Sequence, residues 1–355
     1  MPFVNLSRKC RLIASCFGYI PAVFACCCLA LSVTAAPRLQ RGHEPVIHVL
    51  IKQTSSVVTL PLEEYLRGVV PSEIGASAPP EAKAAQAVAA RAFAAVALGS
   101  RKHAAEGCDV CDTVHCQVYS ALDKATTATD AAVSATRGLI LMYAGKPMPA
   151  YYASNCGGHT EDIGNSWPER ANQAAYRGIA HLDGAGKSDL DLTKDADFRK
   201  WLASSPDAYC NPQKSEVVGW AGKNFRWTRE LTADEATSLV ATKKDIGRVL
   251  QIRAGTRGES GRLSEVEFVG EKGKLRVSPQ LSIRDLFDPM LKSSAFSVET
   301  SGPATRPTHF ILRGAGSGHG VGMCQTGAMG MANAGKSFRE ILKHYYPKAI
   351  LEKFY

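Results

Sequence analysis

The stretch RGVVPSEIGASAPPEAKAAQAVAARAFA, residues 67–94, decides how the first half of the chain folds. Pro71 predicts the end of a helix that begins in PLEEYLRG, with Thr59 as its cap, because proline lacks the backbone N–H that a helix interior needs. The prolines at 79–80 predict the start of the next helix. Glu73 is therefore expected at a joint between two helices.

The second helix is predicted over 80–98 and is almost entirely alanine, which favours close packing against neighbours on several sides. After Glu81, its polar side chains are Lys83, Gln86 and Arg91. An arginine among Ala, Val and Phe needs a carboxylate partner or an anionic ligand. A structural ion pair with some acid is one interpretation of Arg91, and a role at an active site is the other.

Glu73 has apolar neighbours in Val69, Val70 and Ile74. A partly apolar setting raises the pKa of a carboxyl group and lets it hold a proton near neutral pH, as a general acid must. The alternative is a loop carboxylate that simply faces water. The segment alone does not decide between the two.

The rest of the chain mixes strands and helices without a regular alternation, which predicts an α+β fold. We expect strands at about 46–60, in 138–154, in FRWTREL, in the Gly-rich run 249–278 and in HFILRGAG; we expect helices at about 121–136, in 189–206, from Thr232, in LSIRDLFDPML and near KSFREILKHYY. A chain of 355 residues with 45% hydrophobic residues can bury a substantial core.

The first 36 residues differ from the rest. Arg8, Lys9 and Arg11 precede a nearly uncharged apolar stretch that ends in small residues around Ala35, a pattern that predicts an export signal. Because the apolar span is long, an uncleaved membrane anchor is the alternative. Removing these three charges from the formal +9 leaves +6 for 37–355, a stretch long enough for one large domain or two ordinary ones. Because no basic run with interleaved aromatics appears, we expect no nucleic-acid partner.

Three cysteines fall within nine residues of HAAEGCDVCDTVHCQVYS. Cys108, Cys111 and Cys116, with His115 and His103, give five candidate ligands for the four positions of a tetrahedral zinc site. Four protein ligands would make the site structural, because no position remains for water. A disulfide between Cys108 and a neighbouring cysteine is the alternative.

Two Gly-rich stretches, 151–167 and 314–330, are expected to form polar loops that lie close to a ligand. The second resembles a nucleotide-binding loop only weakly, because no Lys-Ser or Lys-Thr pair follows it. A cysteine protease would use Cys156 or Cys324 with His159 or His319, but nothing visible would lower a thiol pKa.

Together VVPSEI, EAKAAQAVAARAFA, CDTVHCQVY, YYASNCGGHTE and GHGVGMCQTGA resemble the SpoIID/LytB family, whose members are also called amidase enhancers. The motifs come in the family's order over about 47–350. The resemblance implies a lytic transglycosylase of peptidoglycan, with Glu73 as the catalytic glutamate and Arg91 in the same machinery. It also implies a structural zinc ion, with ligands His103, Cys111, His115 and Cys116, and leaves Cys108 spare.

The resemblance further suggests that both Gly-rich loops line one cleft. The residues expected to bind substrate there are Gln86, Ser154, Gly157, Gly158, His159, His319, Gly320 and Gln325. Thr326 departs from the family, where tyrosine or tryptophan is commoner. Cys156 and Cys324 stand where many relatives have serine, so a disulfide between them is one hypothesis, and Cys156 with Cys210 is the rival.

We therefore predict an exported enzyme of the periplasm or cell envelope that cleaves peptidoglycan glycan strands. The alternative is a non-catalytic wall-binding protein that activates a cell-wall amidase, and a scaffold with an inactive site is a third interpretation. A glutamate placed to donate a proton favours the enzyme, because a pure binding protein has no need of one.

Overall fold

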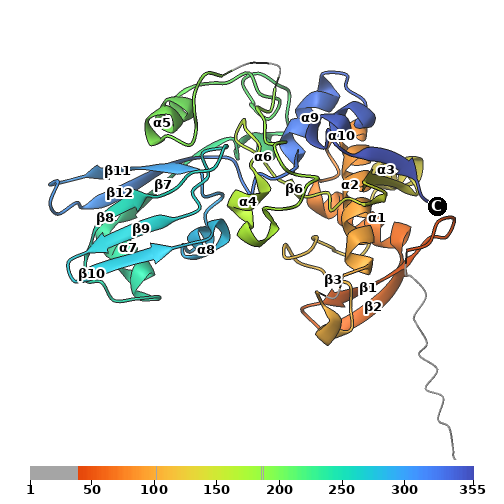
Figure 1. Cartoon of the computed structure of the whole chain (residues 1–355), viewed down its shortest axis with the longest axis horizontal. Coiled ribbons are helices and arrows are strands. Elements are labelled where there is room, and N and C mark those ends of the chain that lie inside the picture. The colour runs from red at the N-terminus through yellow and green to blue at the C-terminus, as the bar shows by residue number, and fades with distance from the viewer. Residues whose placement is uncertain (1–38, 101, 185, 187) are drawn as a thin grey trace, which may run out of the picture. The chain divides into compact units, whose positions relative to one another are not determined.

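The computed structural model describes residues 39–100, 102–184, 186 and 188–355, and Pro37–Tyr355 forms one compact unit. The expected leader, 1–36, lies outside the described residues. Helices and small sheets are intermixed (Figure 1), which confirms the α+β fold class.

The chain begins with a hairpin of β1 (Val46–Ile51) and β2 (Ser56–Pro61), which confirms the strands expected at about 46–60. The short strand β3 (Val110–Cys111) pairs with β1 in parallel. Thr59 was expected to cap the first helix, but it lies inside β2 opposite His48. The helix instead follows Pro61, whose ring fixes the backbone angle without a side-chain cap.

Helix α1 (Leu62–Glu73) continues through Pro71, so the prediction that this proline ends the helix was wrong. Proline removes only one backbone donor from the helix. The hydroxyl of the following residue, Ser72 Oγ, donates to Gly68 O at 2.7 Å and stabilises the same turn. The helix ends at Glu73, with Ile74 as its C-cap. Gly75 follows at φ +83°, the left-handed conformation that glycine adopts at little cost. Glu73 is thus the last helical residue rather than part of a loop.

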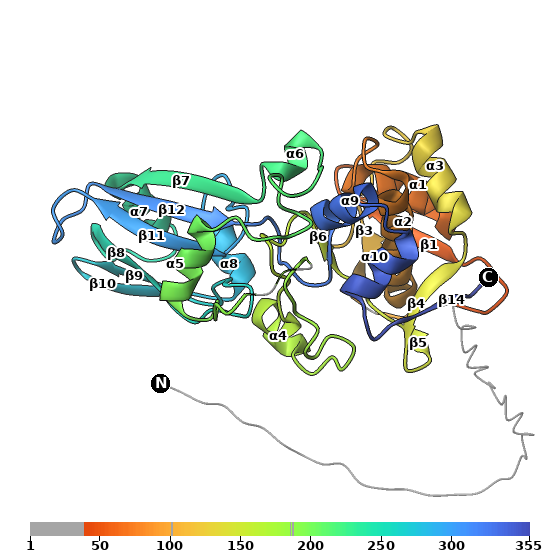
Figure 2. The same ribbon diagram turned by 90° about the horizontal axis from the view of Figure 1, so that it is seen from above.

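Helix α2 (Pro80–Leu98) has the predicted bounds and lies in the middle of the larger core, with 14 of its 19 residues buried. It contacts α1, α3 (Thr127–Ala135), β4 (Leu139–Tyr143), α9 (Gln325–Asn333) and α10 (Phe338–Tyr345), as Figures 1 and 2 show. The alanines allow this packing on several sides, as expected from the sequence.

A second core lies between two three-stranded sheets, ordered β11-β12-β7 and β10-β9-β8. Their strands are β7 (Arg226–Thr232), β8 (Val249–Ala254), β9 (Val266–Gly270), β10 (Gly273–Val277), β11 (Phe296–Ser301) and β12 (His309–Ala315). Helix α7 (Ala233–Ala241) starts at Thr232 with the capping box that its sequence predicts, whereas β11 was missed.

The strand expected over 138–154 is broken into β4, β5 (Lys146–Pro147) and β6 (Tyr152–Ala153), with positive φ at Ala144 and Gly145. Strand β6 pairs in parallel with β13 (Met323–Cys324), which joins the two Gly-rich stretches, and the missed strand β14 (Ile350–Lys353) pairs with β4. The remaining elements are η1 (Ala104–Glu106), α4 (Ile163–Ser166), η2 (Pro168–Arg170), α5 (Asp195–Ala203), α6 (Gly219–Gly222) and α8 (Gln280–Asp285).

Candidate active site

One face of α1 packs against the segment 103–121, which we call the metal loop. At Gly68 a β-carbon would lie 2.2 Å from Ala121 O, so only glycine allows this close approach. One turn later Ser72 Oγ lies 2.6 Å from Ser120 Oγ, and Glu73 meets Val118. The helix and the metal loop therefore run side by side up to Glu73.

Neutral groups donate every hydrogen bond that Glu73 accepts within the described residues. Val118 N–H donates to Oε1 at 2.6 Å, and Gln325 Nε2 donates to Oε2 at 3.4 Å. The Tyr152 hydroxyl is a third donor. These donors come from the metal loop, from the first turn of α9 and from β6, so the carboxylate lies where three distant segments meet.

Burial raises the pKa of Glu73 to about 7, against the three hydrogen bonds, which favour the ionised form. The side chain is half-buried, so it is withdrawn from bulk water without being sealed from a ligand. A carboxyl group with this pKa is present in both protonation states near neutral pH, which suits it to donate a proton and take one back.

Gln117 and Tyr152 complete the surroundings of Glu73, and the sequence did not single out either of them. Gln117 Nε2 donates to Tyr152 OH at 2.7 Å and to Ala90 O at 3.3 Å, while its Oε1 accepts from Tyr65 OH at 3.1 Å. Gln117 thereby ties the metal loop to both α1 and α2. Tyr152 is the second residue of the motif YYASNCGGHTE and Gln117 lies in CDTVHCQVY, so membership of these motifs was the available signal.

Gln86 lies behind Gln325 and accepts a hydrogen bond from its Nε2 at 3.2 Å. It is fully buried, and its own Nε2 has no partner within the described part of the chain. Gln86 therefore orients Gln325 toward Glu73, whereas a direct contact of Gln86 with substrate stays a prediction.

Arg91 lies away from this group, in a buried ion pair with Glu63. Its Nε and Nη2 each donate to one oxygen of Glu63 at 2.8 Å, and Nη1 donates to Leu139 O at 3.2 Å. Arg91 is 0% exposed and Glu63 is 7% exposed. The structure thus favours the structural ion pair over the expected catalytic role, because the guanidinium is sealed inside the core.

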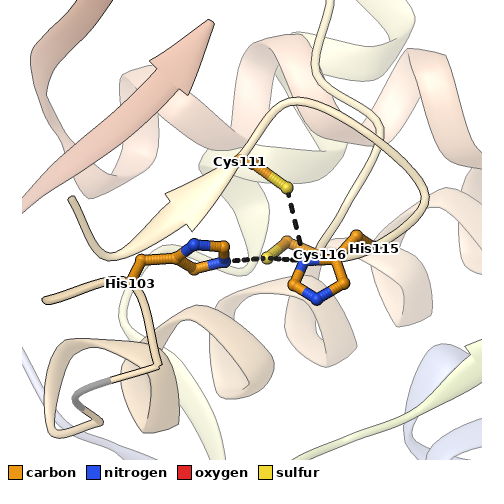
Figure 3. Close-up of side chains that lie close together, drawn as sticks. All are labelled: His103, Cys111, His115 and Cys116. Carbon is orange, nitrogen blue, oxygen red and sulfur yellow. Dashed lines mark hydrogen bonds between the residues drawn. The ribbon is translucent and has the colours of Figure 1, made fainter. Parts of the chain in front are cut away.

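The four expected metal ligands come together in the metal loop, where their side chains point toward one another (Figure 3). His103 Nε2 lies 3.1 Å from Cys116 Sγ, and His115 Nδ1 lies 3.6 Å from Cys111 Sγ and 3.5 Å from Cys116 Sγ. All four ligand atoms lie within 4.8 Å of one another. In a tetrahedral zinc site with bonds of about 2.0–2.3 Å, ligand atoms are roughly 3.3–3.8 Å apart. The residues therefore fit a metal ion.

The surroundings of this cluster also suit a metal. His103 Nδ1 lies 3.7 Å from Glu106 Oε1, beyond hydrogen-bond distance, and a carboxylate is the kind of group that commonly accepts from the second nitrogen of a metal-bound histidine. Cys108 is buried beside Leu50 and Cys111 and is not part of the four-ligand group. Cys108, Cys111 and Cys116 are all free thiols, so the alternative disulfide is not formed.

The two Gly-rich motifs meet at β6 and β13, but their glycines contact protein. Gly157, Gly158 and Gly320 are buried, and a β-carbon on each would meet Ala315, Trp201 and Arg262 respectively, at 3.0 Å or less. These glycines let chain segments pack closely, and their contact with substrate stays a prediction. The weak nucleotide-loop interpretation finds no support in this packing.

The other predicted substrate-binding residues are dispersed. Ser154 is half-buried and accepts from Asn224 Nδ2 at 3.1 Å. His159 lines a separate cavity of about 350 Å³ with Leu182 and Trp201, and Glu73 is not part of its lining. Substrate binding by Ser154 and His159 stays a prediction.

His319 is held in place by its neighbours and is uncharged near pH 7. Its Nδ1 accepts from Val321 N–H at 3.0 Å, and its ring lies 4.7 Å from that of Trp167. Burial lowers the pKa of His319 to about 3, and burial likewise lowers that of His159 to about 4, so both rings are neutral. His319 is thus a packing residue beside the β6 backbone, and contact with substrate stays a prediction.

A second carboxyl group with a raised pKa lies elsewhere in the chain. Burial raises the pKa of Glu161 to about 7, but Glu161 is only 2% exposed. Ser260 Oγ and Asn165 Nδ2 donate to its Oε2 at 2.7 and 3.0 Å. Because its carboxylate is buried and already hydrogen-bonded, Glu161 links two loops. Of the two carboxyl groups with a pKa of about 7, Glu73 is the one that a ligand can approach.

Comparison with known proteins agrees with this arrangement. Residues 51–143 match the family described as Stage II sporulation protein (SpoIID). Stage II sporulation protein D of Bacillus amyloliquefaciens is 30% identical, over 87% of this chain and 81% of that protein. The Bacillus subtilis protein of the same name is 31% identical, over 82% of this chain and 74% of that relative. The chain belongs to the SpoIID family.

Another relative with a descriptive name is the amidase enhancer of Bacillus subtilis, which is 29% identical over 81% of this chain. An uncharacterized protein of Brachyspira hyodysenteriae is 31% identical over the same share. The chain spans 40% of the length of the amidase enhancer and 65% of the length of the Brachyspira protein. Residues 176–322 match a domain of unknown function (DUF8618).

The SpoIID match contains Glu73 and all four candidate metal ligands. Gln325 and Tyr152 lie outside it and reach Glu73 only through the fold. The SpoIID match thus covers Glu73 and the metal loop, while later segments complete the surroundings of Glu73. Among the described residues, no helix is both long and apolar enough to cross a membrane.

Proposed function

We propose that the chain is a lytic transglycosylase that cleaves the glycosidic bond between N-acetylmuramic acid and N-acetylglucosamine in peptidoglycan. The observation that carries this proposal is Glu73, a half-buried carboxyl group with a pKa of about 7 held by neutral donors from three segments. The names of its relatives, sporulation protein D and amidase enhancer, agree with a role at the cell wall.

In the first step protonated Glu73 donates its proton to the glycosidic oxygen, and the bond from that oxygen to the muramic acid C1 breaks. The leaving N-acetylglucosamine end departs as a neutral hydroxyl, so no alkoxide forms. Val118 N–H and Gln325 Nε2 then stabilise the carboxylate that Glu73 has become.

In the second step the Glu73 carboxylate takes the proton from the six-position hydroxyl of the same muramic acid. That oxygen bonds to C1 and closes a 1,6-anhydro ring, and Glu73 is protonated again for the next cycle. Water is not consumed, so one carboxyl group performs both steps, whereas ordinary glycosidases need two.

The metal loop gives Glu73 its shortest hydrogen bond. We propose that His103, Cys111, His115 and Cys116 hold a zinc ion whose role is structural, since four protein ligands leave no position for water. Val118 is two residues beyond Cys116, so fixing the loop fixes the Val118 N–H against Glu73.

We further propose that the chain is exported to the periplasm or cell envelope, where its substrate is, by the signal or anchor in 1–36. Arg8, Lys9 and Arg11 followed by an apolar stretch support export. Residues 37–355 would then be the single catalytic domain, in keeping with the compact unit that they form.

The second candidate function is a non-catalytic activator of a cell-wall amidase, which the name of the Bacillus subtilis relative favours. An activator requires a wall-binding surface but no proton donor. The position and pKa of Glu73 therefore favour the enzyme, and an amidase partner remains compatible with it.

The test is to incubate the purified chain with peptidoglycan and with peptide-free glycan strands in ¹⁸O-labelled water. We expect products that end in 1,6-anhydro-muramic acid and carry no ¹⁸O, because the ring closes without water. Mass spectrometry of the released fragments measures both features, and using two substrates shows whether stem peptides must be removed first.

Fragments with an ¹⁸O-labelled reducing end would make the chain a hydrolase. Uncut glycan, together with faster peptide release by an added amidase, would make it the activator instead. Either result would end the transglycosylase proposal.

A further inference from the structure

A second group of potential metal ligands lies in the core, apart from the metal loop. It consists of Cys156, Asp183, Cys210 and Cys324, whose ligand atoms all lie within 4.8 Å of one another. Each of the four residues is at most 3% exposed. Three thiols and a carboxylate from four separate segments meet here, and nothing in the proposed reaction uses them.

The distances fit a shared ion better than a bond between sulfurs. Cys156 Sγ lies 3.5 Å from Cys210 Sγ and 3.2 Å from Asp183 Oδ2. A disulfide needs about 2.05 Å between sulfurs. Ligands of tetrahedral zinc lie roughly 3.3–3.8 Å apart, given bonds of about 2.0–2.3 Å. All three thiols are free, so neither disulfide expected from the sequence is formed.

Neighbouring groups hold two of these ligands in orientations suited to a cation. Tyr345 OH donates to Asp183 Oδ1 at 2.6 Å, and His344 Nε2 lies 3.4 Å from the same oxygen, so Oδ2 is left to face the thiols. Metal-bound carboxylates are commonly held by hydrogen bonds in this way.

Cys324 is held at the start of α9 as an acceptor. Its Sγ accepts the backbone N–H of Cys156 and that of Gly327, each at 3.2 Å. A sulfur that accepts two N–H bonds is arranged as a thiolate, which is the form that binds metal.

The surrounding charge suits an anionic cluster. Arg262 is fully buried, donates to Cys156 O at 3.1 Å, and has a charge that acts on all three sulfurs. The guanidinium of Arg226 donates to Gly157 O at 2.9 Å, and among the described residues all its hydrogen bonds go to backbone carbonyls. The positive charges of Arg262 and Arg226, together with a divalent ion, would balance the negative charges of three thiolates and a carboxylate.

We propose that Cys156, Asp183, Cys210 and Cys324 form a second, structural zinc site, independent of the metal loop and of the proposed reaction. Binding exchanges the thiol protons for one Zn²⁺ and requires no oxidant. The ion joins the end of β6, the segments around Asp183 and Cys210, and the start of α9. It thereby fixes Cys324 next to Gln325, the residue that bonds Glu73.

The test is zinc content per chain, measured by elemental mass spectrometry on the full-length protein purified under nitrogen without chelators. We expect two zinc ions in the wild type and in Cys108→Ser, one in Cys210→Ser, one in Cys116→Ser, and none in the double variant Cys116→Ser with Cys210→Ser. Cys108→Ser is the matched control, since it removes a buried thiol that belongs to neither group.

Native mass spectrometry of the wild type needs no variant, so it tests the proposal even where the Cys210→Ser protein fails to fold. We expect the mass of the chain plus two zinc ions. Wild-type protein without zinc, or a zinc content that folded Cys210→Ser keeps at the wild-type value, would overturn the proposal. So would non-reduced peptides that join Cys156 to Cys210 or to Cys324.

Discussion

The two ends of helix α1 each carry a carboxyl group in the core, and the two differ in their partners. Glu63, in the first turn, accepts hydrogen bonds from Arg91 Nε and Nη2, each at 2.8 Å. Glu73, in the last turn, is bonded by Val118 N–H, Gln325 and Tyr152, none of which carries a charge. One helix thus presents an ion pair at its start and a group that can be protonated at its end.

Their pKa values show what the difference means. Burial alone would raise the pKa of Glu63, but the hydrogen bonds and charge of Arg91 hold it below its ordinary value. Burial raises the pKa of Glu73 to about 7, because the hydrogen bonds from neutral donors offset the effect of burial only in part. Burial makes a carboxyl group costly to ionise, and the partner decides whether it becomes a structural anion or a proton donor.

The largest effect is expected at the Glu63 end. Glu63→Gln leaves Arg91 buried without a counter-charge, so the free energy of unfolding should fall by about 3–5 kcal/mol. Chemical denaturation followed by circular dichroism measures it. Replacing both partners, Glu63→Leu with Arg91→Met, should recover part of the loss, because no buried charge remains. A Glu63→Gln protein as stable as the wild type would show that the two ends do not differ as described.

The metal loop supplies one of the donors that distinguish Glu73, the Val118 N–H, so loss of a metal ligand should change the active site. His115→Ala should lose the zinc ion and slow the formation of anhydro ends by about 10–100-fold, since hydrogen bonds to charged groups contribute about 1.5–3 kcal/mol. Elemental analysis and product assays measure the two effects. Cys108→Ser is the control and should keep both zinc and activity. Full activity in zinc-free His115→Ala would separate the metal loop from Glu73.

The pH dependence should follow Glu73 and not Glu63. Because the reaction starts from the protonated acid, kcat/KM should be level below about pH 7 and fall roughly tenfold per pH unit above it. Initial rates on peptide-free glycan from about pH 3.5 to about pH 9 give the profile. A decline that begins near pH 4.5, the ordinary range of a carboxyl group, would mean that the pKa of Glu73 is not raised.

The smallest effect is expected from Gln325→Ala, which removes a long hydrogen bond to Glu73, at 3.4 Å. Without that donor the ionised form is less favoured, so the falling limb of the pH profile should move up by less than about one unit, and the rate should fall a few-fold. A downward shift of the limb would contradict the direction of this contact.

Much of the fold follows from local signals. The alanine-rich helix α2, the hairpin β1–β2 and the capped helix after Thr232 were predicted because their caps, turns and periodicity lie within each segment. The two-residue strands β3 and β13 were not, because each exists only through pairing with a distant segment. The prediction that Pro71 ends helix α1 failed for a related reason. The hydrogen bond from Ser72 Oγ to Gly68 O stabilises the turn in which this proline lacks a backbone donor.

The candidate site divides in the same way. Glu73 and the four metal ligands could be named from the sequence, since residue type and close spacing carry their chemistry. The partner of Arg91 could not, because it depends on how α1 lies against α2. Tyr152 and the Val118 N–H were missed because both reach Glu73 only through the folded core.

The most direct test compares Glu73→Gln with wild type in the assay for 1,6-anhydro ends, with unfolding free energies measured in parallel. Glutamine keeps the shape of the side chain and cannot donate or accept the proton, so we expect the rate to fall by about 10²–10⁴-fold while the protein stays folded. A folded Glu73→Gln protein that forms anhydro ends at the wild-type rate would show that Glu73 is not the proton donor.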